Sequence, residues 1–308
     1  MYQCETRRLI SKIDELPISV LVTRPEEEIA VKAVVQLVHG MAEYKERYLP
    51  LMEYLAQQGY ACIIHDHRGH GKSMREEEDK GYLYDAGGDG LVADTVLVNR
   101  FAAKEFPEKP IVMLGHSMGS LVARCYLREN DWDLSALILS GPPTENPAAK
   151  GGLLLARTQK KLRGGRSAGK MLEGIAFGGY YKRFPESRCA WVCSDPVTVR
   201  AYEDDPMCGF TFTADGFVGL MELMCRTYEQ KGWQCARPAL PILFLGGEED
   251  PCIDGRDKFE KAMAHLRGVG YRDVRGKLYS GLRHEICNEG RGKQEVFADI
   301  AAFLDAVT

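Results

Sequence analysis

The chain has 308 residues, of which 45% are hydrophobic and 27% charged, and its formal net charge is −4 at pH 7. This composition is that of a globular protein with a full core, and it excludes a disordered chain and a strongly basic nucleic-acid-binding domain. The length suffices for one large α/β domain with an insertion, or for two small domains.

No segment of the sequence indicates export or membrane insertion. The first residues, MYQCETRRLISKIDE, contain no apolar stretch of the signal-peptide type, and no apolar run approaches the length that crosses a bilayer. The ten cysteines are scattered and form no C-x-x-C pair. We therefore expect a cytoplasmic protein with reduced thiols and no disulfide framework.

Strand and helix patterns alternate along the first 140 residues. Short runs at Cys4–Ser11 and Ile18–Thr23 predict a leading antiparallel pair, and later apolar runs predict buried strands. Further strands are expected at Lys32–Val38, Tyr60–His65, Ile111–Leu114 and Leu134–Ser140, and helices at Glu46–Gln58, Gly90–Phe106 and directly after Gly119. This alternation predicts a mostly parallel sheet covered by helices on both faces.

The alternation stops at Gly141-Pro142-Pro143 and resumes only near residue 237. Two more strands and two more helices then follow, at Pro241–Gly246, Gly255–Arg267, Gly276–Ser280 and Gln294–Ala306. Neither half would close its core alone, so we predict one core from residues 1–141 and 237–308. Residues 142–236, here called the cap segment, are predicted to form loops and short helices inserted after the sixth strand.

The first part of the cap segment is basic. Residues 150–183 contain nine Lys or Arg and a single acid, Glu173. Apolar clusters lie in the same stretch, at Leu153-Leu154-Leu155 and at Phe177-Gly178-Gly179-Tyr180-Tyr181. Such a segment on an acidic protein suggests weak contact with an anionic membrane surface or an acidic substrate. A solvated helix face that packs its apolar residues on the core would give the same pattern.

The sequence Gly115-His116-Ser117-Met118-Gly119 joins an apolar strand to an amphipathic helix. A Gly-x-Ser-x-Gly turn in this context presents the serine hydroxyl at the end of a sheet, beside the N–H groups of the helix. A helix-capping serine in an ordinary turn would satisfy the same five-residue pattern. With the flanking strand and helix, Ser117 is the candidate nucleophile.

A serine nucleophile needs a general base and an acid that orients this base. In the elbow architecture the chain order is serine, acid, histidine. Only His265 and His284 follow Ser117 in the sequence, and His265 lies within a predicted helix. His284 follows the last predicted strand, and Asp250 follows the strand before it. We therefore predict His284 as the base and Asp250 as the acid.

Two backbone amides are expected to bind the negative charge that develops on the reacting oxygen. One is the amide of Met118, directly after the nucleophile. The other is the amide of Met41, in the loop His39-Gly40-Met41-Ala42-Glu43 after the strand that ends at Val38. His39 and Glu43 are expected to brace this loop.

A second motif, His65-Asp66-His67-Arg68-Gly69-His70, is similar to a metallo-hydrolase signature. The aspartate of that signature is Gly69 here, and no later cluster of metal ligands is evident in the sequence. We therefore expect no metal site and no organic cofactor.

Taken together, these motifs resemble the α/β-hydrolase superfamily, within it the lysophospholipase and monoacylglycerol-lipase group that is also named serine aminopeptidase S33. The resemblance rests on His39–Glu43 with Arg47-Tyr48, Asp66–Ser73, Gly115–Gly119, and Ser194-Asp195-Pro196 leading to Ala201-Tyr202 and Asp205-Pro206. It implies the α/β-hydrolase fold, a helical cap over the active site, and a structural role for Asp66–Ser73. Tyr202 matches a cap tyrosine near the polar end of the acyl-glycerol pocket in these lipases.

The predicted function is hydrolysis of a small acyl-ester or lipid-like substrate through an acyl-enzyme on Ser117. One alternative is an aminopeptidase of the proline-iminopeptidase type on the same triad. It would need a cap acid to hold the substrate ammonium group, and the candidates are Glu145, Glu173, Glu186, Glu203, Asp204 and Asp205. Another alternative is a non-catalytic hydrolase fold used for binding, which would be expected to lack a triad member.

Overall fold

The computed structural model describes residues 2–308. Its sheet has eight strands in the order β1-β2-β4-β3-β5-β6-β7-β8, and β3 to β8 run parallel. The strands are β1 (Gln3–Ile10), β2 (Pro17–Arg24), β3 (Val34–Val38), β4 (Ala61–His65), β5 (Ile111–His116), β6 (Ala136–Ser140), β7 (Ile242–Gly247) and β8 (Val274–Tyr279). The predicted leading antiparallel pair is β1 and β2, and β2 also pairs antiparallel with β4.

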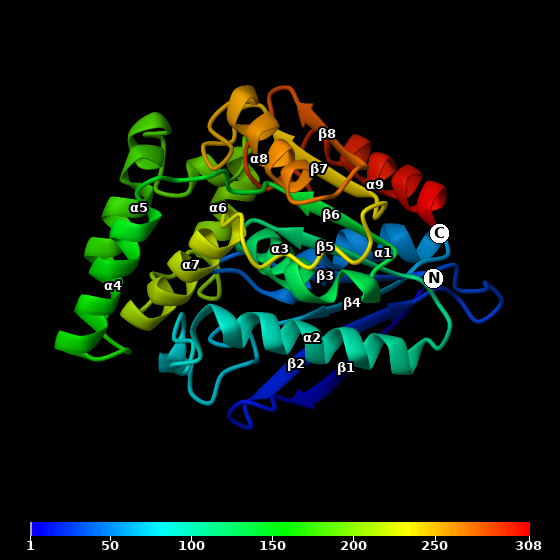
Figure 1. Ribbon diagram of the computed structural model, residues 1–308, viewed down its shortest axis with the longest axis horizontal. Helices are drawn as coiled ribbons and strands as arrows, with labels where there is room; N and C mark the ends of the chain where they lie inside the picture. The colour runs from blue at the N-terminus through cyan, green and yellow to red at the C-terminus, as the bar shows by residue number, and fades with distance from the viewer. Residues whose placement is uncertain (1) are drawn as a thin grey trace.

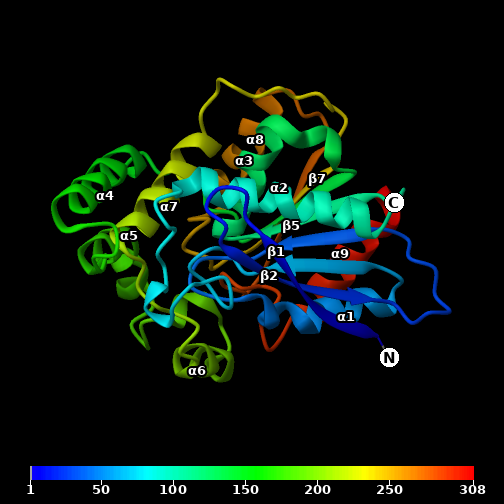
Figure 2. The ribbon, with the colours of Figure 1, turned by 90° about the horizontal axis from the view of Figure 1, so that it is seen from below.

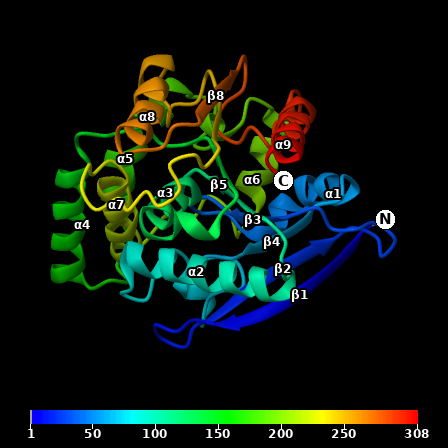
Figure 3. The ribbon, with the colours of Figure 1, turned by 45° about the vertical axis from the view of Figure 1, so that its right-hand side comes forward.

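Helices cover both faces of the sheet, as predicted (Figure 3). The helices α2 (Gly87–Glu105), α3 (Met118–Asn130) and α8 (Arg256–Gly268) contribute to the core on one face, and α1 (Leu49–Gln57) and α9 (Lys293–Val307) to the core on the other. The predicted helix at Glu46–Gln58 begins instead as a 3₁₀ turn, η1 (Lys45–Tyr48). Pro50 then lies in the first turn of α1, where its missing N–H group costs no intrahelical bond.

The cap segment is mainly helical. It contains α4 (Ala149–Arg163), α5 (Lys170–Arg183), η4 (Ala190–Val192), α6 (Pro196–Asp204) and α7 (Ala214–Thr227). The expectation of short helices is wrong for α4 and α5, which have 15 and 14 residues, longer than the average helix. Their glycines interrupt the apolar periodicity but not the helices, because Ala, Leu, Lys and Arg favour helix around them.

The cap helices lie together at one end of the molecule (Figures 1 and 2). The cap segment leaves the sheet at the carboxyl end of β6, so this end of the molecule is the one formed by the carboxyl ends of the parallel strands. The helix α7 packs on α2 and α3, and α4 packs on α7. The cap segment therefore covers the sheet edge at which active sites of α/β proteins are found.

Candidate active site

Ser117 lies in the sharp turn between β5 and α3 and has a strained backbone. Its φ of 52° and ψ of −119° lie outside the regions that non-glycine residues favour. A Cβ atom on Gly119 would lie 2.0 Å from the carbonyl oxygen of Val38, and one on Gly115 would lie 2.5 Å from that of Gly119. Only glycine at these positions lets α3 approach the sheet closely enough to form the turn.

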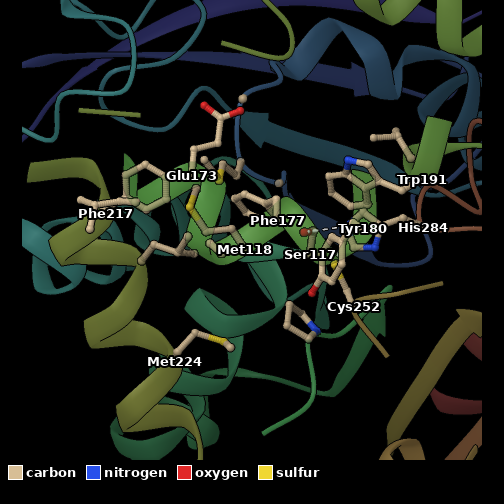
Figure 4. Close-up of a pocket in the computed structure, with 18 of the residues that line it drawn as sticks. Ser117, Met118, Glu173, Phe177, Tyr180, Trp191, Phe217, Met224, Cys252 and His284 are labelled. Carbon is tan, nitrogen blue, oxygen red and sulfur yellow. Dashed lines mark hydrogen bonds between the residues drawn. The ribbon is translucent and has the colours of Figure 1, made fainter. Parts of the chain in front are cut away.

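Two loops bring the predicted base and acid to this serine. Asp250 follows β7 and His284 follows β8, and both side chains are buried. His284 Nε2 lies 2.7 Å from Ser117 Oγ (Figure 4), and His284 Nδ1 lies 2.9 Å from Asp250 Oδ2. The other carboxylate oxygen of Asp250 accepts the backbone N–H of Cys252 at 2.8 Å. The three side chains thus form one continuous hydrogen-bonded chain.

The charge of Asp250 sets the protonation of His284. Burial alone would lower the pKa of the imidazole, but the Asp250 carboxylate, together with the side chain of Cys252, more than offsets burial and holds the pKa of His284 well above its ordinary value. Asp250 therefore stabilises the imidazolium form, which is the form a base acquires when it takes a proton from a hydroxyl group.

The loop after β3 lies against the serine. A Cβ atom on Gly40 would lie 3.1 Å from Ser117 Cβ, so this position has little room for a side chain. Met41 from this loop and Met118 from the first turn of α3 both line the same cavity as Ser117. The backbone amides of a helix N-terminus favour negative charge.

Glu43 braces this loop, as expected from the sequence. Its carboxylate accepts the Gly40 N–H at 2.5 Å, the Tyr48 hydroxyl at 2.9 Å and Arg47 at 2.8 Å. Arg47 also makes two hydrogen bonds, of 2.7 and 2.6 Å, to Glu285, the residue after the base. Burial outweighs the effect of Arg47 and raises the pKa of Glu43 to about 7. The loop after β3 and the loop that carries His284 are therefore joined by one buried ionic cluster.

A cavity of about 180 Å³ lies between these loops and the cap segment. Three aromatic side chains of the cap lie close to the serine and histidine (Figure 4). The Trp191 ring is 5.1 Å from the His284 ring, and Phe177 and Tyr180 contact Trp191 at 5.8 and 5.3 Å. The apolar side chains that continue the wall include Leu121, Leu172, Phe217, Leu220, Met221 and Met224.

Two polar cap residues in the wall are already hydrogen-bonded within the protein. The Tyr202 hydroxyl donates to the carbonyl oxygen of Ala42 at 2.9 Å. The carboxylate of Glu173 accepts bonds from Tyr181 at 2.8 Å, from Arg188 and from Thr211. Of the six cap acids named for the aminopeptidase alternative, Glu173 alone lines this cavity within residues 2–308.

The histidine-rich motif after β4 is part of the packing. Asp66 forms an ion pair of 2.6 Å with Lys45, and His70 accepts the backbone N–H of Ala42 at 3.2 Å. Two other groups have donor atoms close enough together for a metal ion, Asp250–Cys252–His284 and Glu43–His116–Glu285. The first contains His284, which is hydrogen-bonded to Ser117, and Asp250, which is hydrogen-bonded to His284. The guanidinium of Arg47 bridges the two carboxylates of the second.

The structure thus brings Ser117, His284 and Asp250 into hydrogen-bond contact and places Met41, Met118 and Tyr202 around the same cavity. Five further residues line this cavity that were not expected from the sequence: Phe177, Tyr180, Trp191, Cys252 and Glu285. Local signals existed for four of them: Phe177 and Tyr180 belong to the aromatic cluster in the cap, Cys252 lies two positions after the predicted acid, and Glu285 directly follows the predicted base. Trp191 lies outside these patterns.

Ten cysteines are present as free thiols. Within residues 2–308, no helix is both long enough and apolar enough to cross a bilayer.

Comparison with known proteins identifies the group to which this site belongs. The family model for serine aminopeptidase, S33, matches residues 29–291. The chain is 28% identical over 273 residues to a monoacylglycerol lipase of Mycolicibacterium smegmatis, covering 89% of this chain and 88% of that protein. It is 30% identical over 275 residues to a monoglyceride lipase homolog of Monkeypox virus, covering 89% of each.

Among solved structures, a thermostable carboxyl esterase from Bacillus coagulans, in complex with glycerol, is similar over 99% of this chain and 98% of that one. Its TM-score is 0.91 and its sequence identity 26%.

Proposed function

The chain belongs to the serine aminopeptidase S33 family of α/β-hydrolases, and we propose that it cleaves carboxylic esters of the monoacylglycerol or lysophospholipid type through a serine acyl-enzyme. The observation that carries the proposal is the hydrogen-bonded chain Asp250–His284–Ser117 beneath an apolar cavity. Relatives named monoacylglycerol lipase, lysophospholipase and carboxyl esterase support ester hydrolysis as the reaction class.

In the proposed mechanism, Ser117 Oγ attacks the ester carbonyl carbon while His284 Nε2 takes the hydroxyl proton. Asp250 stabilises the resulting imidazolium ion and keeps the ring in the required orientation. The amides of Met41 and Met118 bind the negative oxygen of the tetrahedral intermediate. His284 then gives its proton to the leaving alcohol, and water hydrolyses the acyl-enzyme by the same steps in reverse order.

The cavity wall favours an acyl chain as the bound group. Its side chains beyond Ser117 are mainly aliphatic, aromatic or thioether groups, which gain free energy when they bury an alkyl chain. Its carboxylates at Glu43, Glu173 and Glu285 all pair with arginines of the same chain. Because none of them is left to balance a substrate ammonium group, this arrangement favours an ester substrate over the aminopeptidase alternative. The intact hydrogen-bonded triad likewise disfavours the purely binding alternative.

The test compares the unmodified enzyme with Ser117→Ala on 4-nitrophenyl and glycerol esters of graded acyl length, and on amino-acyl anilides. Loss of the nucleophile removes nearly all triad catalysis, about 10⁶-fold in a serine protease. We expect ester turnover by the unmodified enzyme, none above background with Ser117→Ala, and labelling by a fluorophosphonate only when Ser117 is present.

Unchanged ester turnover by Ser117→Ala would contradict the mechanism. Faster cleavage of anilides than of esters by the unmodified enzyme would favour the aminopeptidase. Folded enzyme that neither turns over nor takes up the probe would favour the binding alternative.

We also propose weak contact of the cap with an anionic membrane surface. Leu154, Leu162 and Met171 of α4 and its neighbour α5 are exposed by 59–76%. Leu155 and Ile175, which line the cavity, are also exposed on these helices. Some basic residues of this part pair with acids of the chain, but six exposed ones form no ion pair within residues 2–308: Lys150, Lys161, Arg163, Lys170, Lys182 and Arg183. Exposed apolar residues among unpaired cations suit an anionic lipid interface.

A further inference from the structure

Ala42, the residue after the proposed oxyanion donor Met41, has an unusual backbone. Its φ is 53°, in the left-handed region that alanine rarely adopts, and its side chain is buried. A strained residue of this kind persists only where surrounding contacts hold it. The contacts on Ala42 therefore hold the loop directly after Met41.

Three hydrogen bonds hold the Ala42 backbone, and they come from two parts of the fold. Its N–H donates to His70 Nε2 at 3.2 Å, on the core side. Its carbonyl oxygen accepts the Tyr202 hydroxyl at 2.9 Å and the Gly209 N–H at 2.9 Å, both from the cap segment. The strained peptide is thus held between the core and the cap.

His70 is restricted to the tautomer that this arrangement needs. Because Nε2 accepts a hydrogen bond from a backbone N–H, the ring proton must be on Nδ1, which lies 3.0 Å from the carbonyl oxygen of Arg68. Phe210 and Phe212 contact the ring at 5.3 and 5.2 Å. Burial lowers the pKa of His70 to about 4, so the accepting form persists at neutral pH.

The side chain of Tyr202 is also held in one position by its neighbours. Its side chain is buried, and the guanidinium carbon of Arg47 lies 4.7 Å from the centre of its ring. Arg47 belongs to the ionic cluster with Glu43 and Glu285 that joins the loop after β3 and the loop that carries His284. Although Tyr202 lines the cavity, its hydroxyl group donates its hydrogen bond to the Ala42 carbonyl oxygen and is not available to donate to a substrate oxygen.

We propose that His70 and Tyr202 are positioning residues that hold Ala42 in its strained conformation and so aim the Met41 amide at the reacting oxygen. This inference rests on the proposed function, and it assigns Tyr202 a role in the oxyanion site in place of direct substrate binding. It also makes oxyanion stabilisation depend on where the cap segment docks, because two of the three bonds come from the cap.

The first experiment measures kcat and KM of Tyr202→Phe on a medium-chain 4-nitrophenyl ester. Phenylalanine keeps the packing on Arg47 and removes only the donor to Ala42. Because a small misplacement of a catalytic group can cost up to about 100-fold, and the Gly209 bond remains, we expect kcat to fall about 10-fold and KM to change by less than about 2-fold. Tyr60→Phe is the matched control: it also deletes a hydroxyl bond of a buried tyrosine, here to Asp305, far from the site in the fold.

A transition-state analogue separates an oxyanion effect from general damage. An alkylboronic acid forms a tetrahedral adduct with the serine, whereas a fatty alcohol of equal length only fills the cavity. We expect the inhibition constant of the boronic acid to rise by the same factor as kcat/KM falls in Tyr202→Phe, and that of the alcohol to stay constant. A rise in KM and in the alcohol constant with unchanged kcat would overturn the proposal, because it would show direct substrate binding by Tyr202.

His70 provides an independent second test. His70→Gln keeps an acceptor at similar reach and His70→Leu does not, so we expect the glutamine variant to retain more kcat than the leucine variant at equal KM. Equal activities of both variants and the unmodified enzyme would overturn the proposal. If the unmodified enzyme hydrolyses esters and Ser117→Ala does not, the proposed function is supported even where the Tyr202 and His70 variants contradict the positioning role. Inactivity of the unmodified enzyme on every ester would reject both.

Discussion

At the scale of single residues, the proposed reaction depends on how neighbouring groups change the pKa of His284. Burial disfavours its imidazolium form, but Asp250, in contact at 2.9 Å, and Cys252 together favour it and raise the pKa of His284. Only the neutral ring can take the proton of Ser117. The activity should therefore rise with pH as His284 loses its proton, and the position of that rise reports the charge on Asp250.

Replacement of Asp250 by asparagine tests this relation. Asp250→Asn removes the charge that raises the pKa of His284, while burial continues to lower it, so the neutral ring persists to lower pH. We expect the acid side of the profile of kcat/KM against pH to move to lower pH, while kcat falls by about 10⁴-fold, as in a serine protease triad. Asp254→Asn, in the same loop but exposed, is the control. An acid side that stays in place in Asp250→Asn would contradict the assignment.

At the scale of elements, the elbow depends on the approach of α3 to β3. Helix propensity alone would favour alanine over glycine within α3. The position of Gly119 reverses this preference, because an added Cβ would overlap the carbonyl oxygens of Val38 and His39 at 2.0 and 2.5 Å. The backbone of β3 cannot move away without disturbing the loop His39–Glu43 that follows it.

The same substitution should therefore have opposite effects at two helical glycines. Gly119→Ala is expected to lower the free energy of unfolding by about 1–3 kcal/mol or more, as overpacking does. Gly174→Ala, within α5, meets no atom within 4 Å, and should raise it by up to about 1 kcal/mol. Urea unfolding followed by circular dichroism measures both changes. Equal effects of the two substitutions would contradict the expectation, because they would show that the close approach at Gly119 does not affect the free energy of unfolding.

At the scale of the whole molecule, charge is distributed unevenly over an acidic protein. The net charge is −4, yet the exposed part of α4 and α5 carries unpaired cations among exposed apolar side chains. Some of the basic residues of the cap segment form ion pairs with acids of the same chain. Lys160 pairs with Asp85 and Asp215, and Arg166 pairs with Asp79. The remaining cations are those available to a membrane.

Sedimentation with anionic phospholipid vesicles tests the membrane contact. Each basic residue near such a surface contributes about 1 kcal/mol, so the triple variant Lys161→Glu, Arg163→Glu, Lys170→Glu should bind at least about 100-fold more weakly. A control with the same change in net charge, Lys104→Glu, Lys109→Glu, Lys261→Glu, alters exposed residues outside the cap segment and should bind nearly as well as the unmodified protein. Binding should also weaken with added salt. Equal loss in both variants would reject a specific cap surface.

The sequence by itself determined the features that local pattern encodes. Apolar runs bounded by glycine and proline predicted the strands of the parallel sheet, and the Gly-x-Ser-x-Gly turn identified Ser117. The positions after β7 and β8 indicated Asp250 and His284, because the ends of parallel strands meet at one edge of a sheet. The cytoplasmic location and the domain boundaries stay predictions.

Only the tertiary structure decided which distant side chains meet. Arg47 and Glu285 are 238 positions apart, and Tyr202 lies 160 positions from the Ala42 carbonyl it binds. No periodicity links such residues, because their contact depends on how the cap segment docks on the core. The same docking brings Trp191 to His284 and pairs Glu173 with Arg188. Local sequence thus indicated the proposed catalytic groups, and packing between segments decided their surroundings.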